Sequence, residues 1–575
     1  MRNRLNSRNC FKLSIVVATA ILSFGLVSCN NDPNSIIEET EVLSSSNFFT
    51  KDIKSDEVYV FFLDIDNINN GLETERTHET EASISVGSCD SYIVKIGNTE
   101  ILIDCGYQTF ASSDSHTRPE PPYQFRYQHI EENVQKNILP KIASICTDGV
   151  LEYLIVTHSD FDHLASLCVQ GGVIDAFNNG QTITNLRGDS IALKSINNVI
   201  DFNSGVVALH SYSKIDKDKR LCRGLYQTYL SKIDNLIKKE TNYLPAAALF
   251  DPSIEAEDKS TMSKENKLLA TPDLMKEYVE DKFETTILTE QQPNSAASVF
   301  VKEVKKNNSY SKCVAKLGGN LKVESNRYFY SINLENIAEF RILYNWYYDF
   351  AYRQNFNDGN RGQPINNPSV CLEVIKNNFK FLSCGDLGGN GESGLINYYK
   401  ETSILKDVTL FRSSHHGSTT NRENSLYLFK TITPKIIAVT GCAQSPLEPK
   451  LPKAAFMKKT FFENIYNGLH DEHEALVKGM TAEPYILCTN INWFRLDGSN
   501  NLGINESKPF YGDIRIRTSP IGTKLNYSYK GNIHAFIKTG GLDGVLDFST
   551  IAKRKLLKVQ ETAWFDKAGF IYGGK

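Results

Sequence analysis

The sequence predicts an α/β fold, and three segments in its N-terminal part carry this prediction. Residues 58–64 form a continuous apolar run, typical of a strand buried on both faces. Residues 128–146 place apolar side chains at the spacing of one helix face. Residues 154–157 form a second buried strand, and a dense polar cluster follows it directly. Strand, helix and strand in this order favour an α/β architecture, in which sites form at the ends of strands.

Composition and charge exclude several classes of protein. Of the 575 residues, 41% are hydrophobic and 11% aromatic, enough for a large core, which excludes a disordered or collagen-like chain. The 63 basic residues nearly balance the 67 acidic ones, so there is no global positive field for nucleic acid. None of the 12 cysteines forms a CxxC pair, which excludes a zinc knuckle and a thioredoxin motif.

Residues 1–28 have the features of an export signal. Basic residues precede an apolar run over 13–27, which is shorter than the roughly 20 residues of a transmembrane helix. The run ends in Leu-Val-Ser-Cys29 and resembles the lipobox of a bacterial lipoprotein. This resemblance implies that Cys29 is lipidated and anchors the protein to a membrane, with its folded part periplasmic or at the cell surface. Asn30 after the cysteine favours the outer membrane.

The segment that follows the signal, residues 29–57, is rich in Ser, Asn and Glu and is expected to be a flexible tether. In an oxidising compartment we expect some disulfides, with pairings that the sequence leaves open. Cysteines in apolar runs, such as Cys105 and Cys384, are expected to act as small core residues.

The next elements follow in order. Residues 92–96 and 101–103 are expected to form a hairpin around Gly97-Asn98. Pro140 is expected to kink the helix over 128–146. Residues 216–327 are charged and helix-prone, which predicts a helix-rich insertion with solvent-exposed lysines.

Strand-like segments return after this insertion and continue the α/β domain to about residue 450. They cover residues 333–343, 369–375, 380–384, 408–411 and 436–440. The domain is therefore predicted over 58–450. The tail, 451–575, contains alternating runs typical of half-buried antiparallel strands and is predicted to be a β-rich C-terminal extension.

The strongest chemical signal is the sequence THSDFDH over residues 157–163. It places His158, Asp160, Asp162 and His163 directly after a buried strand. Alternate residues in extended backbone point the same way, and imidazole together with carboxylate holds divalent transition metals well. The segment therefore predicts a metal site.

Two later segments supply further ligand-type side chains at strand ends. Asp386 follows the strand over 380–384, and His415 and His416 follow the strand over 408–411. A carboxylate that bridges two metal ions, flanked by histidine and aspartate ligands, is an arrangement suited to metal-activated hydrolysis.

With these residues in place, the chain resembles the metallo-β-lactamase superfamily in the HxDxDH form of its motif. Together with Gly385-Asp386 and the sequence SHHGS, it is similar to the ComEC-like branch, whose domain is nuclease-like and extracytoplasmic. Further matching segments are residues 62–65, 87–91, 102–106, 366–370 and, weakly, 513–518. The resemblance implies an αββα sandwich with its site at one edge of the two sheets.

The resemblance also implies a set of ligands for two divalent metal ions. His158 and Asp160 would bind one ion, and Asp162 and His163 the other, with Asp386 between them. Either His415 or His416 would complete the second site, and the adjacent histidine would contact substrate. Asp104 would orient a ligand through hydrogen bonds. Because Asp160 replaces a histidine, we expect zinc or manganese.

The third ligand of the first ion has no clear match in the chain. His210 is a candidate, although a surface histidine is the simpler interpretation. His470 and His473 have the i,i+3 spacing of a helix, but an exposed charged helix explains them as well.

The function expected from this resemblance is that of a metal-dependent hydrolase outside the cytoplasm. A phosphodiesterase or nuclease-like activity is implied, with nucleic acid or another phosphodiester as substrate; the sequence indicates no protein partner. Asp160 or Asp162 would orient a metal-activated water, and His416 or Ser418 would bind the developing charge. The alternative is a non-catalytic surface lipoprotein that uses the fold as a binding or scaffold module.

Overall fold

The computed structural model describes the two-sheet core of the chain and several strands of its tail. The described residues are 49–50, 53–65, 89–107, 128–202, 228–250 (without 230 and 234), 316–345, 366–418, 423–443 (without 435), 485–491, 510–518 (without 512), 524–529 and 542–547. The predicted signal segment 1–28, Cys29 and most of the tether lie outside these residues, as do His210, His470 and His473.

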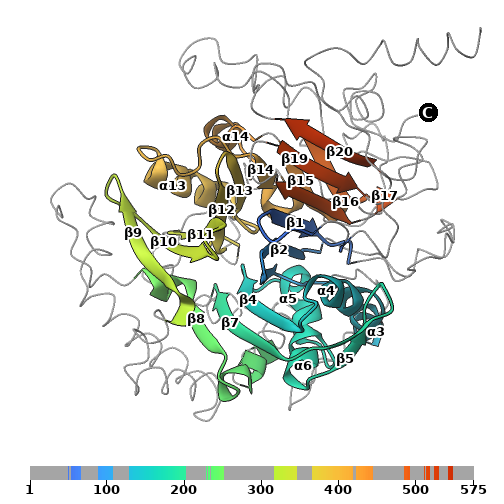
Figure 1. Ribbon diagram of the computed structural model, residues 1–575. Coiled ribbons are helices and arrows are strands. Elements are labelled where there is room, and N and C mark those ends of the chain that lie inside the picture. Colours follow the sequence, from blue (N-terminus) through green and yellow to red (C-terminus); the bar gives the residue numbers. More distant parts are fainter. Residues whose placement is uncertain are drawn as a thin grey trace, which may run out of the picture.

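Two nine-stranded sheets make up the core (Figure 1). The strands of the first sheet are, in spatial order, β20 (Leu542–Asp547), β19 (Lys524–Tyr529), β18 (Ile514–Thr518), β1 (Val58–Phe62), β2 (Tyr92–Ile96), β3 (Thr99–Ile103), β4 (Val150–Val156), β7 (Ser195–Asp201) and β8 (Asn242–Pro245). Neighbours are antiparallel from β20 to β3 and parallel from β3 to β8. Strands β2 and β3 form the predicted hairpin around Gly97, whose φ of 60° suits glycine.

The second sheet has the same number of strands. They are, in spatial order, β17 (Phe510–Tyr511), β16 (Tyr485–Ile491), β15 (Ile436–Ala443), β14 (Leu410–Arg412), β13 (Phe379–Ser383), β12 (Cys371–Lys376), β11 (Ala338–Leu343), β10 (Arg327–Leu334) and β9 (Gly319–Glu324). Strands β13 to β16 run parallel, and the other neighbours are antiparallel. The carboxyl ends of β13 and β14 therefore lie at one edge, as those of β3, β4 and β7 do in the first sheet.

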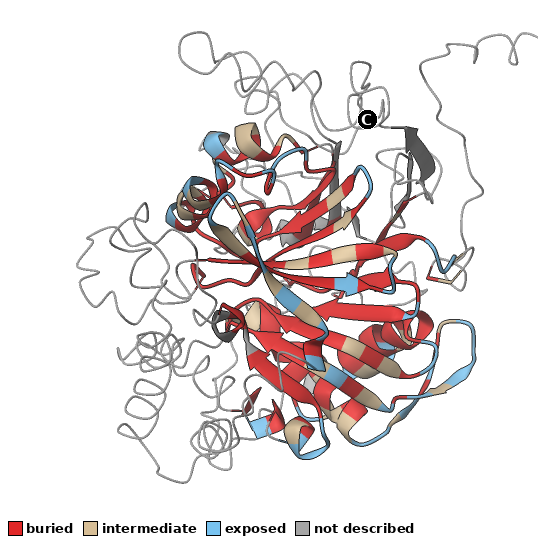
Figure 2. Cartoon of the chain, turned by 60° about the vertical axis from the view of Figure 1, so that its left-hand side comes forward, coloured by how far each residue is buried: buried red, intermediate tan, exposed pale blue. Residues whose placement is uncertain are grey.

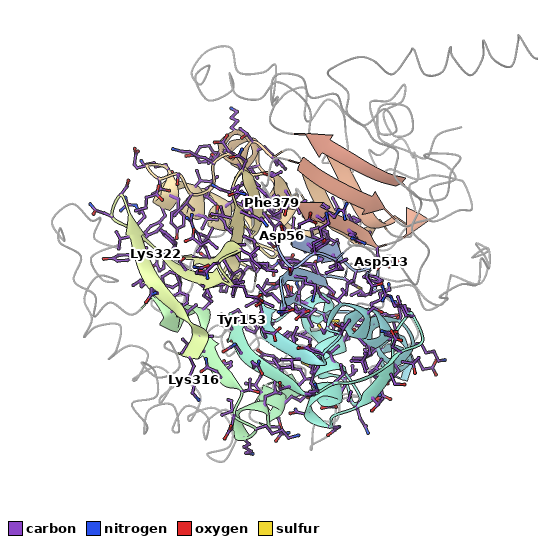
Figure 3. The ribbon with its side chains drawn as sticks, in the orientation of Figure 1. Asp56, Tyr153, Lys316, Lys322, Phe379 and Asp513 are labelled. Carbon is purple, nitrogen blue, oxygen red and sulfur yellow. The ribbon has the colours of Figure 1, made fainter. Side chains whose placement is uncertain are left out.

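The two sheets contact each other through aromatic side chains. The ring of Phe381 on β13 lies 6.0 Å from that of Phe62 and 5.8 Å from that of Tyr92, both on the first sheet. Tyr153 on β4 lies between the layers, 6.3 Å from the ring of Phe340 (Figure 3). Figure 2 shows buried residues along the strands of both sheets. Burial of these rings is the main favourable term that holds the sheets together.

Helices flank the sheets, which agrees with the predicted α/β class (Figure 1). Beside the first sheet lie α3 (Gln128–Asn133), α4 (Leu139–Ile145), α5 (Phe161–Cys168) and α6 (Val173–Asn178). Beside the second lie α13 (Gly389–Tyr399) and α14 (Leu426–Ile432). Within the described part of the chain, no helix has the length and apolar character needed to span a membrane.

The predicted helix over 128–146 is irregular at the place where the proline lies. Residues Val134–Ile138 form a π-helical segment between α3 and α4, and Pro140 occupies the first turn of α4. Proline has no N–H for the i−4 carbonyl, and the wider π turn accommodates this loss without ending the helix.

The expected helix-rich insertion over 216–327 is corrected at two strands. Strand β8 extends the first sheet, parallel to β7, and β9 forms the edge of the second sheet beside β10. Both are edge strands in the described chain, so polar residues such as Lys322 and Glu324 can face solvent. The charged, partly exposed sequence of β9 therefore resembles that of an exposed helix, whereas β8 is short, uncharged and buried.

The predicted tail is joined to both sheets. Strand β18 pairs with β1, and β16 pairs in parallel with β15. Just before β18, the Asp513 carboxylate accepts hydrogen bonds from the Asp64 backbone N–H (2.8 Å) and from Lys141 Nζ (2.9 Å), and both charged side chains are buried. Figure 3 marks Asp513 beside the strands of the tail. One buried ion pair thus ties the tail to α4.

Six cysteines of the described residues are buried and form no disulfide: Cys89, Cys105, Cys146, Cys168, Cys371 and Cys384. They act as small core residues, as expected for Cys105 and Cys384. The expected disulfides are absent among these six.

We expect Asp513→Ala to lower the free energy of unfolding by about 3–5 kcal/mol, because it leaves the Lys141 ammonium buried without its carboxylate. The measurement is urea denaturation followed by far-UV circular dichroism. The double variant Lys141→Met/Asp513→Asn removes both charges and is expected to recover most of the loss. A single-variant loss under about 1 kcal/mol would show that this pair does not hold the tail.

Candidate metal centre

The segment after β4 carries four of the predicted ligands: His158, Asp160, Asp162 and His163. Strand β4 ends at Val156 and α5 begins at Phe161, with Asp160 in extended backbone just before the helix (φ −70°, ψ 155°). An aspartate at this position usually caps the helix, but the Asp160 side chain makes no capping hydrogen bond. Asp162 and His163 follow in the first helical turn, so the end of one strand supplies carboxylates and imidazole together.

Asp386 reaches the same edge from the second sheet. Strand β13 ends at Ser383, and Gly385 then adopts a φ of 54°, a conformation that glycine adopts without strain. The backbone N–H of Asp386 donates to Ser369 Oγ at 3.2 Å. This turn holds the Asp386 carboxylate toward the first sheet.

His415 and His416 lie in a strained turn after β14. Both have left-handed backbone angles, with φ of 45° and 50°, which is uncommon for residues other than glycine. The Asn424 side chain holds the turn: its Oδ1 accepts from the Ser414 N–H, and its Nδ2 donates to the carbonyls of Ser414 and Ser418. Strain of this kind persists only where surrounding contacts impose it, and it is concentrated at functional sites.

One oxygen atom lies among all four imidazoles. The distances from Asp386 Oδ2 to the Nε2 atoms are 3.2 Å for His163, 3.3 Å for His416, 3.7 Å for His158 and 3.9 Å for His415. The residues come from three separate segments, which follow β4 in the first sheet and β13 and β14 in the second, so the fold itself assembles this centre.

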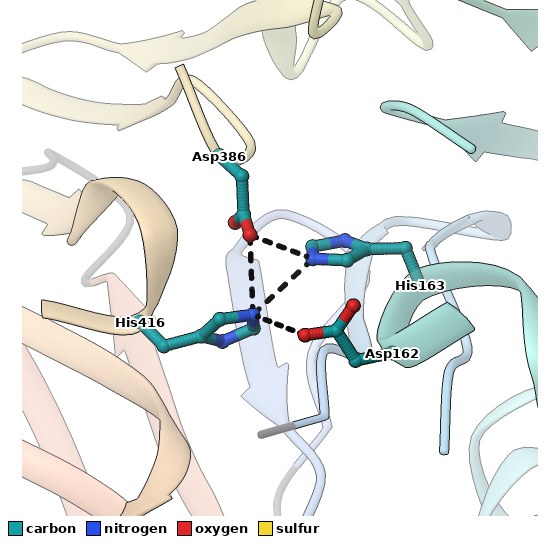
Figure 4. Close-up of side chains that lie close together, drawn as sticks. All are labelled: Asp162, His163, Asp386 and His416. Atoms are coloured by element: carbon teal, nitrogen blue, oxygen red, sulfur yellow. Dashed lines mark hydrogen bonds and ion pairs between the residues drawn. The ribbon is translucent and has the colours of Figure 1, made fainter. Parts of the chain in front are cut away.

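Four side chains form a compact group, shown in Figure 4: Asp162, His163, Asp386 and His416. Their ligand atoms lie within 4.8 Å of one another, and Asp162 Oδ2 is 3.2 Å from His416 Nε2. Tetrahedral ligands at zinc-like bond lengths are about 3.3 Å apart. The group is buried, and its spacing fits a bound metal ion.

The remaining predicted ligands, His158, Asp160 and His415, lie outside this compact group. His158 Nε2 is 3.8 Å from Asp160 Oδ2, and it makes no hydrogen bond in the described structure although it is buried. A buried nitrogen without a hydrogen-bond partner is costly unless something binds it. The side chains of Asp160 and His415 are 29% and 14% exposed, whereas those of His158 and His163 are fully buried. This side of the centre is therefore the more open one.

Hydrogen bonds behind the rings settle which nitrogen faces the centre. His163 Nδ1 lies 2.7 Å from Asp104 Oδ2, a group that only accepts, so Nδ1 carries the proton. Thr157 Oγ1 donates to the same carboxylate and lies 3.1 Å from His158 Nδ1, so it accepts from that ring. Asp104 thus orients His163 directly and His158 through Thr157, and leaves each Nε2 lone pair directed at the centre.

The two later histidines are held in the same way. His415 Nδ1 is 2.8 Å from Glu423 Oε1, and His416 Nδ1 donates to the carbonyl oxygen of Thr440. Both acceptors lack a hydrogen, so the Nδ1 atoms donate. All four neutral rings therefore present Nε2 to the centre, which is the usual arrangement of metal-binding histidines.

Electrostatics in the metal-free centre favour protons on two imidazoles. Burial opposes the charge, but the carboxylates of Asp386 and Asp104 raise the pKa of His163 well above its ordinary value. For His416, burial is outweighed by Asp386 and Asp162, which raise the pKa to about 9. These protons occupy the positions where a cation would bind.

Arg412 and Glu423 contact the predicted ligands, and neither was predicted from the sequence. Arg412 is fully buried at the end of β14 and contacts Asp386 and Asp90. Its position as a charged residue in an otherwise apolar strand could have indicated Arg412 from the sequence. Glu423 lies seven residues after His416, and no local sequence pattern indicates its contact with His415.

The sequence left open the roles of His415, His416 and Ser418, and the structure shows the position of each. His416 joins Asp162 and His163, and His415 lies on the open side. Ser418 is buried, and its carbonyl accepts a hydrogen bond from Asn424.

No known protein family matches the chain, and no curated protein matches it either. The interpretation of the centre therefore depends on its own geometry.

We expect Gly106→Ala to disrupt the centre by displacing the backbone of Asp162 and His163. A Cβ at this position would lie 1.6 Å from the Asp162 carbonyl oxygen and 2.3 Å from the His163 backbone nitrogen, so the ligand turn must move. Metal bound per chain should fall sharply, as measured by inductively coupled plasma mass spectrometry.

Gly188→Ala is the matched control for this substitution. Nothing lies within 4 Å of a Cβ at this position, so only its backbone strain, about 1–2 kcal/mol, should appear. Full metal content in Gly106→Ala would contradict the packing described here.

We expect the affinity of the centre for Zn²⁺ to rise with pH. Metal binds the neutral imidazole, so it must displace the protons that the raised pKa values of His163 and His416 hold. Displacement of the His416 proton should raise the affinity by about tenfold per pH unit up to about pH 9, and displacement of the His163 proton should add to this slope.

Calorimetry in buffers of different ionisation enthalpy counts these protons directly. At neutral pH at least one proton should be released as metal binds. An affinity that stays constant over this range, with no proton release, would be inconsistent with the electrostatics of the centre.

Proposed function

We propose that this protein is a metal-dependent hydrolase with a centre for two divalent ions. The observation that carries the proposal is the position of Asp386 Oδ2 among four imidazole Nε2 atoms at 3.2–3.9 Å. A single carboxylate oxygen between two sets of ligands is suited to bridging two ions.

The assignment of ligands follows from the two sides of the centre. Asp162, His163, Asp386 and His416 would hold one ion. His158, Asp160, Asp386 and His415 would hold the other, which supplies the ligand that the sequence left without a match. Zinc or manganese suits this set of imidazoles and carboxylates.

Charge supports a pair of divalent ions. Six carboxylates lie at or directly behind the centre: Asp90, Asp104, Asp160, Asp162, Asp386 and Glu423. Arg412 is the one guanidinium that contacts them within the described residues, which leaves five negative charges when the imidazoles are neutral (6 − 1 = 5). Two divalent ions would compensate four of these charges, and buried charge requires compensation.

Two such ions, when bound, lower the pKa of water and polarise a phosphoryl or carbonyl oxygen. The chain's own residues hold the ligands in place: Asp104, Glu423 and the Thr440 carbonyl fix the rings. Substrate would enter on the side of Asp160 and His415, where the side chains are most exposed. His416 is engaged through both nitrogens, so we assign it to ion binding instead of contact with substrate.

The proposed substrate is a phosphodiester, including nucleic acid, and the proposed fold is the αββα sandwich of the metallo-β-lactamase superfamily. The HxDxDH and SHHGS sequences support this class, as do two facing sheets flanked by helices. We further propose that the protein acts outside the cytoplasm as a lipoprotein anchored through Cys29, from its N-terminal sequence.

We expect about two metal ions per chain in protein purified without chelator, and a sharp fall in Asp386→Ala, because each half of the centre loses a shared ligand. Metal content is measured by inductively coupled plasma mass spectrometry. Hydrolysis of bis(p-nitrophenyl) phosphate and of DNA should fall with it.

Glu401→Ala removes an exposed carboxylate away from the centre and should change neither readout. A wild-type protein that binds no zinc or manganese after both are added back would refute the hydrolase. Two bound ions without hydrolysis of any phosphodiester would refute the substrate class alone.

A further inference from the structure

Arg412 lies directly behind the centre and makes several polar contacts, including one of 3.3 Å between its Nη2 and His416 Nδ1. It is fully buried at the end of β14. Its Nη2 is 2.7 Å from Asp90 Oδ2, and its Nη1 is 3.1 Å from Asp386 Oδ1. Nη1 also donates to the Gly385 carbonyl at 2.5 Å, and Nε donates to Thr440 Oγ1 at 3.0 Å. Together these contacts hold the guanidinium in a single orientation.

The two oxygens of Asp386 therefore have different surroundings. Oδ1 accepts from Arg412, whereas Oδ2 faces the imidazoles. A carboxylate with both oxygens available can turn to chelate one ion with the pair. A carboxylate whose Oδ1 is held by a fixed cation can offer only Oδ2 to both sides.

Arg412 is itself held from the first sheet. Its partner Asp90 is tied by backbone hydrogen bonds: the Asp90 N–H donates to the Asp162 carbonyl (2.9 Å), and the Gly106 N–H donates to the Asp90 carbonyl (3.0 Å). One side of the guanidinium is thus fixed to the turn that carries Asp162, and the other side to the turn that carries Asp386. Arg412 sets the two ligand turns at a constant separation.

We propose that Arg412 is a positioning residue that makes Asp386 a single-oxygen bridge between two metal ions. The inference depends on the proposed two-ion centre and deepens it. Arg412 touches neither ion nor substrate in this arrangement. It acts through the orientation of one carboxylate and through the spacing of the two turns.

Four variants of the full-length protein test this role: Arg412→Met, Arg412→Lys, Asp90→Asn and the double variant Arg412→Met/Asp90→Asn. Methionine removes the charge and the donors, whereas lysine keeps a charge and one donor. The double variant removes the buried Asp90 charge as well, so it folds even if Arg412→Met alone does not.

Two readouts are independent of activity. Competition with a chelator gives the affinity for each of two Zn²⁺ ions, and electron paramagnetic resonance of the Co²⁺-loaded protein reports magnetic coupling through a shared oxygen. We expect Arg412→Met and the double variant to bind the second ion about 10–100-fold more weakly and to lose the coupling. Arg412→Lys keeps the charge and one donor, and Asp90→Asn keeps an acceptor for Nη2, so each should lose less of the second ion and of the coupling than Arg412→Met does.

Two results would overturn the inference. One is a double variant that binds both ions with wild-type affinity and coupling. The other is Arg412→Lys losing as much as Arg412→Met, which would show that side-chain packing, and not the charged donor, is what matters. If the wild-type protein binds no divalent ion, the proposed function fails and this inference with it. If it binds two and the variants match it, only this inference fails.

Discussion

The concentration of buried negative charge at one edge of the two sheets is the constraint on which the rest of the structure depends. Asp90, Asp104 and Asp386 are almost completely buried, and Arg412 is the one permanent cation in contact with this cluster among the described residues. Burying an ionised carboxylate without compensation costs several kcal/mol. The raised pKa values of His163 and His416 show one compensation, by protons. Divalent ions would be another, so ion binding and stability are coupled in such a centre.

The topology explains how distant segments satisfy this constraint together. Strands β3 and β4 are parallel neighbours in one sheet, and β13 and β14 in the other. Their carboxyl ends deliver Asp104, His158, Asp386 and His416 to the same edge. The aromatic contacts between the sheets fix the distance across the centre, because Tyr92 packs on Phe381 and its hydroxyl lies 2.6 Å from Ser383 Oγ. Ligand geometry thus follows from core packing.

Much of this arrangement could be predicted from the sequence because its signals are local. A buried strand followed at once by THSDFDH identifies both the element and its ligands. The choice between His415 and His416 could not be predicted, since it depends on two left-handed residues and on the Asn424 side chain. The position of β18 beside β1 is a pairing between residues more than 400 positions apart, which no local pattern encodes. Edge strand β9 was not recognised because of its charged residues, and β8 was not recognised because it is only four residues long.

The two proposed halves of the centre differ in spacing and in exposure. On the ligand assignment proposed above, the half with His163 and His416 has ligand atoms 3.2–3.3 Å apart and fully buried rings. The half with His158, Asp160 and His415 has spacings of 3.7–3.9 Å and the more exposed side chains. A compact, buried set of ligands holds an ion in fixed geometry, whereas a looser, more open set leaves room for a water molecule and for substrate. The shared carboxylate connects these halves, and its orientation decides whether they act as one centre.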